Sequence, residues 1–237
     1  QLAALEAGPR LAAVGSRIEI FPREELTDGL RGYEGWLNSL TDPAEILRDR
    51  FVESPLVHPA ATLRAAALRE VGGWSAQGWP EDYALWLALL ARGWSLANVP
   101  ELLLRWRDRG DRLTRSHPDY AMQAHVRLKC HHLARGPLAS GRCILWGAGK
   151  TGKAFRRELS ALGVRVERFV DIDPRKVGRE LHGAPVIGPA QLGPFEGTHL
   201  VAAVGARGAR ALSRSHLPDL DPAEACQVTA DEGEQFT

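Results

Sequence analysis

A strand-like run followed by a glycine-rich turn and a helical pattern is the feature that most constrains the fold of this 237-residue chain. The apolar run Cys143–Trp146 leads into Gly-Ala-Gly-Lys-Thr-Gly, and a helical pattern follows over residues 153–162. Gly147, Gly149 and Gly152 therefore have the G-x-G-x-x-G spacing. In such a turn the first glycine allows a tight bend, the second lets a phosphate approach the backbone, and the third lets helix and strand pack closely. This pattern predicts a strand–turn–helix unit.

The residues after this unit predict a parallel, doubly wound sheet. Further strands are expected over Arg165–Val170, Ala184–Ile187 and His199–Val204, alternating with helical or loop segments. Asp171 ends one of these strands, 24 residues after Gly147, near the distance at which an acid meets a ribose hydroxyl in such folds. We expect a Rossmann-type module in which the three glycines and Asp171 either bind a nucleotide or form a purely structural turn.

Two other enzyme classes fit this loop less well. A nucleotide-hydrolysing P-loop needs a glycine five residues before Gly149, where the chain has Ile144. A nicotinamide-dependent oxidoreductase is a weaker alternative, because the chain from Cys143 onward contains roughly four strands and no following substrate domain. A non-catalytic protein that binds a nucleotide or sugar nucleotide through the Gly147–Gly152 loop is the main alternative to an enzyme.

The composition is that of an ordinary soluble globular protein. Thirty basic and 29 acidic residues give a net charge of +1, so no overall field favours nucleic acid. Cys130, Cys143 and Cys226 match no zinc pattern. No apolar run reaches the roughly 18 residues of a membrane span and no signal peptide is visible. We expect a cytoplasmic protein without a transmembrane segment, at most peripheral at the inner face of the membrane.

The first half of the chain is predicted to be a separate α/β domain. A Gly/Pro/Ser-containing stretch over 133–141 separates the halves, which predicts domains at 1–136 and 137–237. The chain opens at Gln1 within structured-looking sequence, from which we expect a fragment of a longer protein. The elements expected in the first domain are strands over 12–21, 94–99 and 102–106, and helices over 32–40, 43–50, 65–71, 80–92 and 120–133. Residues 56–64 are expected to form a strand or a loop that leads into a strand, and Pro59 suits the edge of a sheet there.

The helix over 80–92 begins with two adjacent acids, Glu81 and Asp82, after a loop rich in glycine and tryptophan that ends in Trp79. The backbone N–H groups and partial positive charge at a helix start favour acids there, so the pair has a simple structural interpretation. The alternative is that one carboxylate accepts a proton from a substrate hydroxyl. The helix start is expected to keep Asp82 ionised.

Several motifs of the first half resemble, in order and spacing, the C-terminal part of family 2 glycosyltransferases, which have a GT-A fold. The resemblance covers roughly residues 10 to 133. The motifs that carry it are Ser54–Pro59, Arg64, Val71–Trp74, Pro80–Leu87, Arg92-Gly93 and Val99–Glu101. It implies an enzyme that transfers a sugar, with inversion, from a nucleotide-sugar donor to a hydroxyl of a glycan or lipid-linked acceptor in surface polysaccharide synthesis. It also implies that Asp82 is the general base, with Glu81 as a capping or supporting neighbour.

The resemblance suggests substrate-binding residues around this acid pair. The loop Arg105–Arg115 is basic and contains Trp106. Its Arg112 and Arg115 either hold the donor pyrophosphate or pair with the loop's own aspartates. His58 either lies at the acceptor site or is a buried, hydrogen-bonded histidine.

The chain departs from the family pattern at the metal site. Such enzymes hold a divalent metal through an Asp-x-Asp motif, and this chain has that form only at Asp171–Asp173, in the second half. We therefore expect Mg²⁺ or Mn²⁺ in the full-length enzyme, with ligands outside this chain, and no activity from this chain alone.

The second half has a resemblance of its own. It is similar to the Rossmann-like N-terminal domains of bacterial sugar acyltransferases, which bind nucleotide-linked sugars. The residues that carry this similarity are Phe169–Pro174, Gly178, His182–Gly188 and Val204-Gly205. The resemblance implies an accessory domain that follows the transferase part.

Overall fold

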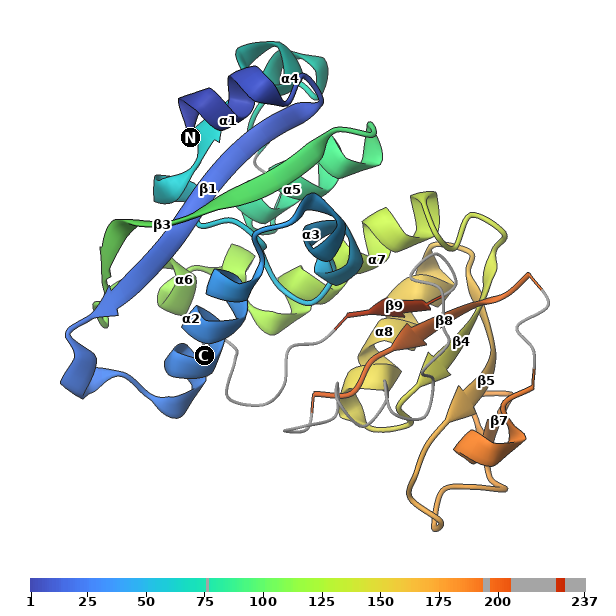
Figure 1. Cartoon of the computed structure of the whole chain (residues 1–237). Helices are drawn as coiled ribbons and strands as arrows, with labels where there is room; N and C mark the ends of the chain where they lie inside the picture. Colours follow the sequence, from blue (N-terminus) through green and yellow to red (C-terminus); the bar gives the residue numbers. More distant parts are fainter. Residues whose placement is uncertain (76, 194–196, 206–224, 229–237) are drawn as a thin grey trace. The chain divides into compact units, whose positions relative to one another are not determined.

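The computed structural model describes residues 1–75, 77–193, 197–205 and 225–228, which belong to two compact units (Figure 1). The first unit comprises Gln1–His125 and the second begins at Val126, within helix α7 (Met122–Arg135). Each unit contains a sheet with parallel strands accompanied by helices, so the α/β fold class is confirmed. That the units are a partial GT-A domain and a Rossmann-like domain, joined after residue 136, stays a prediction.

The sheet of the first unit is built on two long parallel strands, β1 (Leu11–Phe21) and β3 (Ser95–Arg107), which lie side by side in Figure 1. The two strands expected over 94–99 and 102–106 are one continuous strand. Ser16 pairs with Val99 and Arg17 with Leu102, so Pro100 and Glu101 bulge out of the ladder. Proline has no N–H to donate, which explains why the irregularity falls there.

The third strand of this sheet is much shorter than the sequence suggests. Of the two alternatives for residues 56–64, the structure has the loop that leads into a strand, because residues His58–Ala60 form a 3₁₀ turn with Pro59 in its first positions. Only β2 (Thr62–Leu63) pairs, antiparallel to Ala13 and Val14 of β1. The edge position expected from the proline is confirmed, since the strand order is β2-β1-β3.

The helices of the first unit mostly follow their local signals. Thr27 accepts a hydrogen bond from the backbone N–H of Leu30 (3.2 Å), so α2 begins four residues earlier than expected. A short helix at the start of the chain was not expected. The helices are α1 (Leu2–Ala7), α2 (Asp28–Ser39), α3 (Pro43–Asp49), α4 (Ala65–Glu70), α5 (Glu81–Ala91) and α6 (Leu113–Ser116).

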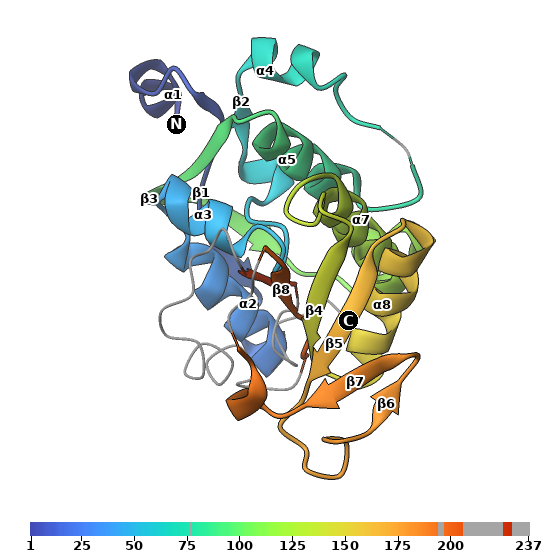
Figure 2. The same ribbon diagram turned by 90° about the vertical axis from the view of Figure 1, so that its right-hand side faces the viewer.

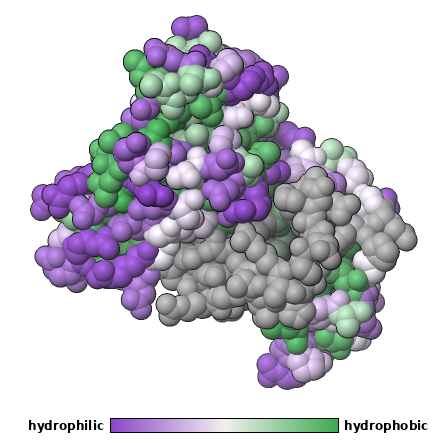
Figure 3. Space-filling view, in the orientation of Figure 1, coloured by the Kyte–Doolittle hydropathy of each residue, from purple (hydrophilic) through white to green (hydrophobic). Residues whose placement is uncertain are grey.

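Helix α5 is the buried centre of the first unit and lies against β3 (Figures 1 and 2). Tyr83 and Trp86 are fully buried, and burial of one large apolar side chain stabilises a fold by about 1.5–3 kcal/mol. The Trp86 indole donates to the Leu56 carbonyl (3.2 Å), and the Tyr83 hydroxyl donates to the Arg50 carbonyl (2.7 Å). These contacts fix the first turn of α5, which carries the acid pair. The face of this unit visible in Figure 3 is mainly hydrophilic, with hydrophobic residues interspersed.

The second unit contains the parallel sheet predicted from the glycine loop. Its strand order is β6-β7-β5-β4-β8-β9, and every described pairing is parallel except β6 with β7, a hairpin seen in Figure 2. Helix α8 (Lys150–Ala161) starts three residues earlier than expected, directly after Gly149. The strands are β4 (Arg142–Trp146), β5 (Arg165–Val170), β6 (Glu180–Leu181), β7 (Ala184–Ile187), β8 (His199–Ala202) and β9 (Ala225–Gln227).

Candidate functional site

Asp82 lies in the first turn of α5 and is the most strongly perturbed acid of the first unit. The residue as a whole is half-buried, but its carboxylate is enclosed by protein, and this burial raises its pKa to about 6. A hydrogen bond from the Tyr83 N–H (2.7 Å) and the charge of His58 lower the pKa, while Glu81 and Glu53 raise it. Desolvation therefore outweighs the helix terminus in setting the pKa of Asp82, although the carboxylate stays mostly ionised at neutral pH.

Glu81 is held by a tyrosine from a distant segment. Its Oε2 accepts a hydrogen bond from the Tyr120 hydroxyl (2.7 Å), which belongs to the 3₁₀ turn Pro118–Tyr120. Burial and this bond raise the pKa of Tyr120 far above its usual range, so the hydroxyl stays protonated and donating. Glu81 is thereby fixed next to Asp82, in a position that suits a supporting role.

The arginine loop makes internal ion pairs. Arg112 lies half-buried with its guanidinium 3.8 Å from the centre of the Trp106 ring, and its Nη1 is 3.2 Å from Asp108. Arg115 contacts the other oxygen of Asp108 at 2.7 Å. Burial lowers the pKa of Arg112 despite this acid. The arginines thus adopt the arrangement of the second alternative, in which they pair with an aspartate of their own loop.

His58 is exposed, so the alternative of a buried, hydrogen-bonded histidine is wrong. The 3₁₀ turn presents its imidazole to solvent, where it stacks on the Trp74 ring with 5.5 Å between centroids and 24° between planes. Trp74 is 43% exposed and follows two glycines with positive φ, a backbone conformation that favours glycine. Trp79 is half-buried, two residues before the acid pair.

Three groups near Asp82 were not identified from the sequence. Burial raises the pKa of Tyr33, on α2, well above 10, and the negative charges of Glu53 and Asp82 raise it further. Glu53 is buried, and the His125 Nε2 lies 3.7 Å from its carboxylate. These residues are far apart in sequence and share no motif. The one signal in the sequence was Glu53 itself, an acid in the otherwise apolar run after α3. The structure thus brings Asp82 into a group of acidic, aromatic and imidazole side chains.

The three glycines of the loop in the second unit differ in how closely other atoms approach them. A Cβ on Gly152 would collide with the Gly147 carbonyl oxygen, and one on Gly147 would lie 2.7 Å from the Ala203 oxygen. Those two glycines are required by packing. Gly149 has ordinary extended backbone, and a Cβ at this position would meet nothing within 4 Å, so open space lies beside it. This is compatible with either the nucleotide or the structural interpretation of the loop.

The Asp171 carboxylate accepts hydrogen bonds from other residues of the second unit. Its Oδ2 accepts from the Ala148 N–H (2.9 Å) and the Lys176 ammonium (2.8 Å), and its Oδ1 accepts from the Asp173 N–H (2.9 Å). Burial acts to raise the pKa of Asp171, but these hydrogen bonds outweigh it and the pKa is lowered. The carboxylate therefore closes the glycine loop in this structure.

A divalent metal is not accommodated by the part of the chain that the structure describes. Among residues 1–75, 77–193, 197–205 and 225–228, no group of three or more histidine, cysteine, aspartate or glutamate side chains could hold an ion. In the one Asp-x-Asp sequence, Asp173 is engaged by Arg175 (3.0 Å) and Asp171 by the glycine loop. No step of the chemistry proposed for this chain is routed through a metal.

Comparison with known proteins gives one partial similarity. No protein-family model matches the chain. The UDP-Gal:alpha-D-GlcNAc-diphosphoundecaprenol beta-1,3-galactosyltransferase of Escherichia coli is 33% identical over 76 residues, which cover 32% of this chain and 28% of that protein. The matched part of the chain thus spans less than a third of that relative, and the similarity supports a glycosyltransferase-like protein without assigning a family. No helix among the described residues has the length and apolar character needed to cross a bilayer.

Proposed function

We propose that this chain is part of an inverting glycosyltransferase in which Asp82 is the general base. The observation that carries the proposal is an enclosed carboxylate at the start of a buried helix, with its pKa raised to about 6. The partial similarity to a galactosyltransferase supports the same reaction class. We propose a nucleotide sugar as donor and a hydroxyl of a glycan or lipid-linked sugar as acceptor.

The proposed step needs a base that is ionised at neutral pH and still basic enough to accept a proton. A carboxyl with a pKa of about 6 is roughly nine-tenths ionised at pH 7, and it is a stronger base than an ordinary aspartate. The Asp82 carboxylate takes the proton of the acceptor hydroxyl as its oxygen attacks the anomeric carbon. The bond from that carbon to the nucleoside diphosphate breaks, and the departing phosphate oxygen keeps the electron pair.

The surrounding side chains suggest supporting roles. Glu81, held by Tyr120, keeps a second negative charge beside Asp82 and so favours its basic character. We propose that His58 and Trp79 contact the acceptor. A sugar ring can pack its C–H groups against an exposed aromatic face such as that of Trp74, on which His58 stacks.

The donor diphosphate is proposed to bind the arginine loop. Arg112 and Arg115 would exchange the Asp108 carboxylate for phosphate oxygens, with Trp106 supporting the Arg112 guanidinium. Mg²⁺ or Mn²⁺ belongs to the proposal for the natural protein, with ligands outside this chain. The second unit is proposed as an accessory domain, with the open space beside Gly149 as its nucleotide contact.

The proposal is tested by assaying the natural protein that contains this chain. Sugar transfer from UDP-galactose to a lipid-linked N-acetylglucosamine, the substrates in the relative's name, is measured first, followed by other nucleotide sugars. Asp82→Asn is expected to lower kcat by a factor of about 10² to 10⁴ with little change in donor KM. Glu101→Gln, an exposed acid on β3, is the matched control and should leave kcat unchanged. Full activity in Asp82→Asn would rule out Asp82 as the base.

A further inference from the structure

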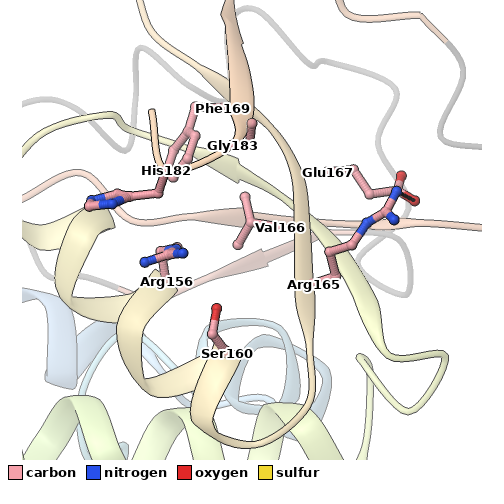
Figure 4. A pocket seen from close by; sticks show the side chains of 9 residues that line it. Arg156, Ser160, Arg165, Val166, Glu167, Phe169, His182 and Gly183 are labelled. Atoms are coloured by element: carbon pink, nitrogen blue, oxygen red, sulfur yellow. Dashed lines mark ion pairs between the residues drawn. The ribbon is translucent and has the colours of Figure 1, made fainter. Parts of the chain in front are cut away.

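The second unit contains a hollow that is separate from the glycine loop. It has a volume of about 360 Å³ and lies between α8, the start of β5 and the turn that joins β6 to β7 (Figure 4). Val166, Phe169 and Ala184 lie beneath it and are buried, so the surface that the hollow offers to a ligand is mainly polar. The volume of the hollow lies within the range of small-molecule sites.

Arg156 brings an unneutralised charge to this hollow. It is half-buried on α8, and within the described part of the chain it has no ion pair or side-chain hydrogen bond, whereas its neighbour Arg157 pairs with Glu158 at 3.0 Å. Glu167 is the one acid of the lining, and it pairs with Arg142 (3.7 Å) and Arg165 (4.0 Å). Figure 4 shows Glu167 and Arg165 on the other side of β5 from Arg156. The hollow therefore presents positive charge.

His182 has a positive φ, which is uncommon for residues other than glycine. His182 (φ 53°) and Gly183 (φ 81°) are the two central residues of the β6–β7 hairpin turn. Two-residue turns with both φ values positive favour Asn-Gly, and His182 is the one non-glycine residue with positive φ in the described ranges. Strained backbone of this kind is concentrated at functional sites. In Figure 4 the His182 and Arg156 side chains both lie at the hollow, and the Ser160 hydroxyl points toward it.

We propose that this hollow binds the phosphate group of a small molecule. The Arg156 guanidinium donates two parallel hydrogen bonds, and the His182 imidazole and Ser160 hydroxyl donate to the remaining oxygens. Three donors from two separate elements suit the several oxygens of a phosphate better than the two of a carboxylate. None of these residues belongs to the glycine loop or to the Asp82 site, so the proposal does not depend on the proposed transferase activity.

Inorganic phosphate is the probe for a direct test. The isotope-labelled 237-residue chain is titrated with phosphate at constant ionic strength, and the NMR signals of the Arg156 Nε–H and the His182 ring are followed. We expect saturable shifts of both signals with a millimolar Kd. Arg156→Gln should raise the Kd at least tenfold. Arg156→Lys, which keeps the charge but loses the two-pronged donor, should give an intermediate Kd.

Two further variants separate a built site from general attraction. His182→Asn removes the imidazole but suits the turn, so it should weaken binding severalfold while the melting temperature is unchanged or higher. Arg157→Gln removes a positive charge from the next position of α8 and should leave the Kd unchanged. Signals that do not saturate, or equal weakening by Arg157→Gln and Arg156→Gln, would overturn the proposal. Loss of transfer activity in Asp82→Asn would leave phosphate binding intact, so the two proposals fail separately.

Discussion

Replacing Asp82 by asparagine is expected to stabilise the first unit at neutral pH. Burial raises the pKa of Asp82 to about 6 from an ordinary value of 3.8, a difference of roughly 2 pH units. At about 1.36 kcal/mol per unit, keeping this carboxylate ionised in the folded chain costs up to about 3 kcal/mol. Solvent screening of the half-buried residue brings the expected gain to between about 1 and 3 kcal/mol. Asparagine keeps the oxygen that accepts from the Tyr83 N–H, so that hydrogen bond survives.

The raised pKa of Asp82 also determines whether the stability of the folded chain rises or falls with pH. A raised pKa means that the folded chain binds the Asp82 proton more tightly than the unfolded chain does. The free energy of unfolding of the wild type should therefore fall as pH rises from about 4 to about 6, and this loss should persist above pH 6. The advantage of Asp82→Asn should consequently be full at pH 7 to 8 and vanish below about pH 4.

Urea unfolding followed by tryptophan fluorescence measures this effect, because six of the seven tryptophans lie in the first unit. The wild type and Asp82→Asn are compared at several pH values between 4 and 8. The exposed Glu101→Gln control should stay within about 0.5 kcal/mol of the wild type throughout. The reasoning is refuted if Asp82→Asn is less stable than the wild type at pH 8, or if its advantage does not change with pH.

Four further substitutions test the packing of the two units by denaturant unfolding. Tyr120→Phe removes the hydrogen bond to Glu81 and should destabilise the first unit by about 1–3 kcal/mol; an unchanged midpoint would mean that the bond does not form in solution. Gly152→Ala should prevent folding of the second unit while Gly149→Ala changes its stability by less than about 1 kcal/mol, and equal effects would contradict the loop geometry. Asp171→Asn should cost the second unit about 1–3 kcal/mol at pH 7. Since the pKa of Asp171 is lowered in the folded chain, the stability lost in Asp171→Asn should disappear as pH falls below about 4. A loss of stability that does not change with pH would contradict the lowered pKa.

Local patterns were sufficient for several of the regular elements. The buried helix α5, the parallel strands β5 and β7 and the glycine turn were predicted to within one or two residues, because periodicity and glycine spacing reside in the sequence itself. The sequence left a strand and a loop-strand open for residues 56–64, since local composition does not show that Thr62–Leu63 alone pair with a neighbouring strand.

Local sequence patterns could not predict the surroundings of Glu81 and Asp82. Asp82 itself was identified from its motif, but its raised pKa depends on enclosure by segments that lie up to tens of residues away. Glu53, Tyr33 and Tyr120 carry no motif and approach Asp82 or Glu81 only through the fold. The hollow beside Arg156 is likewise a product of the arrangement of α8 and the β6–β7 turn. Sequence patterns thus located a candidate base and not the surroundings that determine its chemistry.

The pH dependence of sugar transfer by the natural protein tests most directly whether Asp82 is a general base with a raised pKa. The value of kcat/KM for the nucleotide sugar and acceptor is measured between pH 5 and 8 in the wild type and in Asp82→Asn. We predict that kcat/KM of the wild type rises with pH, with its midpoint near pH 6, and that the variant shows a residual, pH-independent rate at least a hundredfold lower. A wild-type midpoint near pH 6 that persists in Asp82→Asn, with undiminished rate, would contradict the assignment.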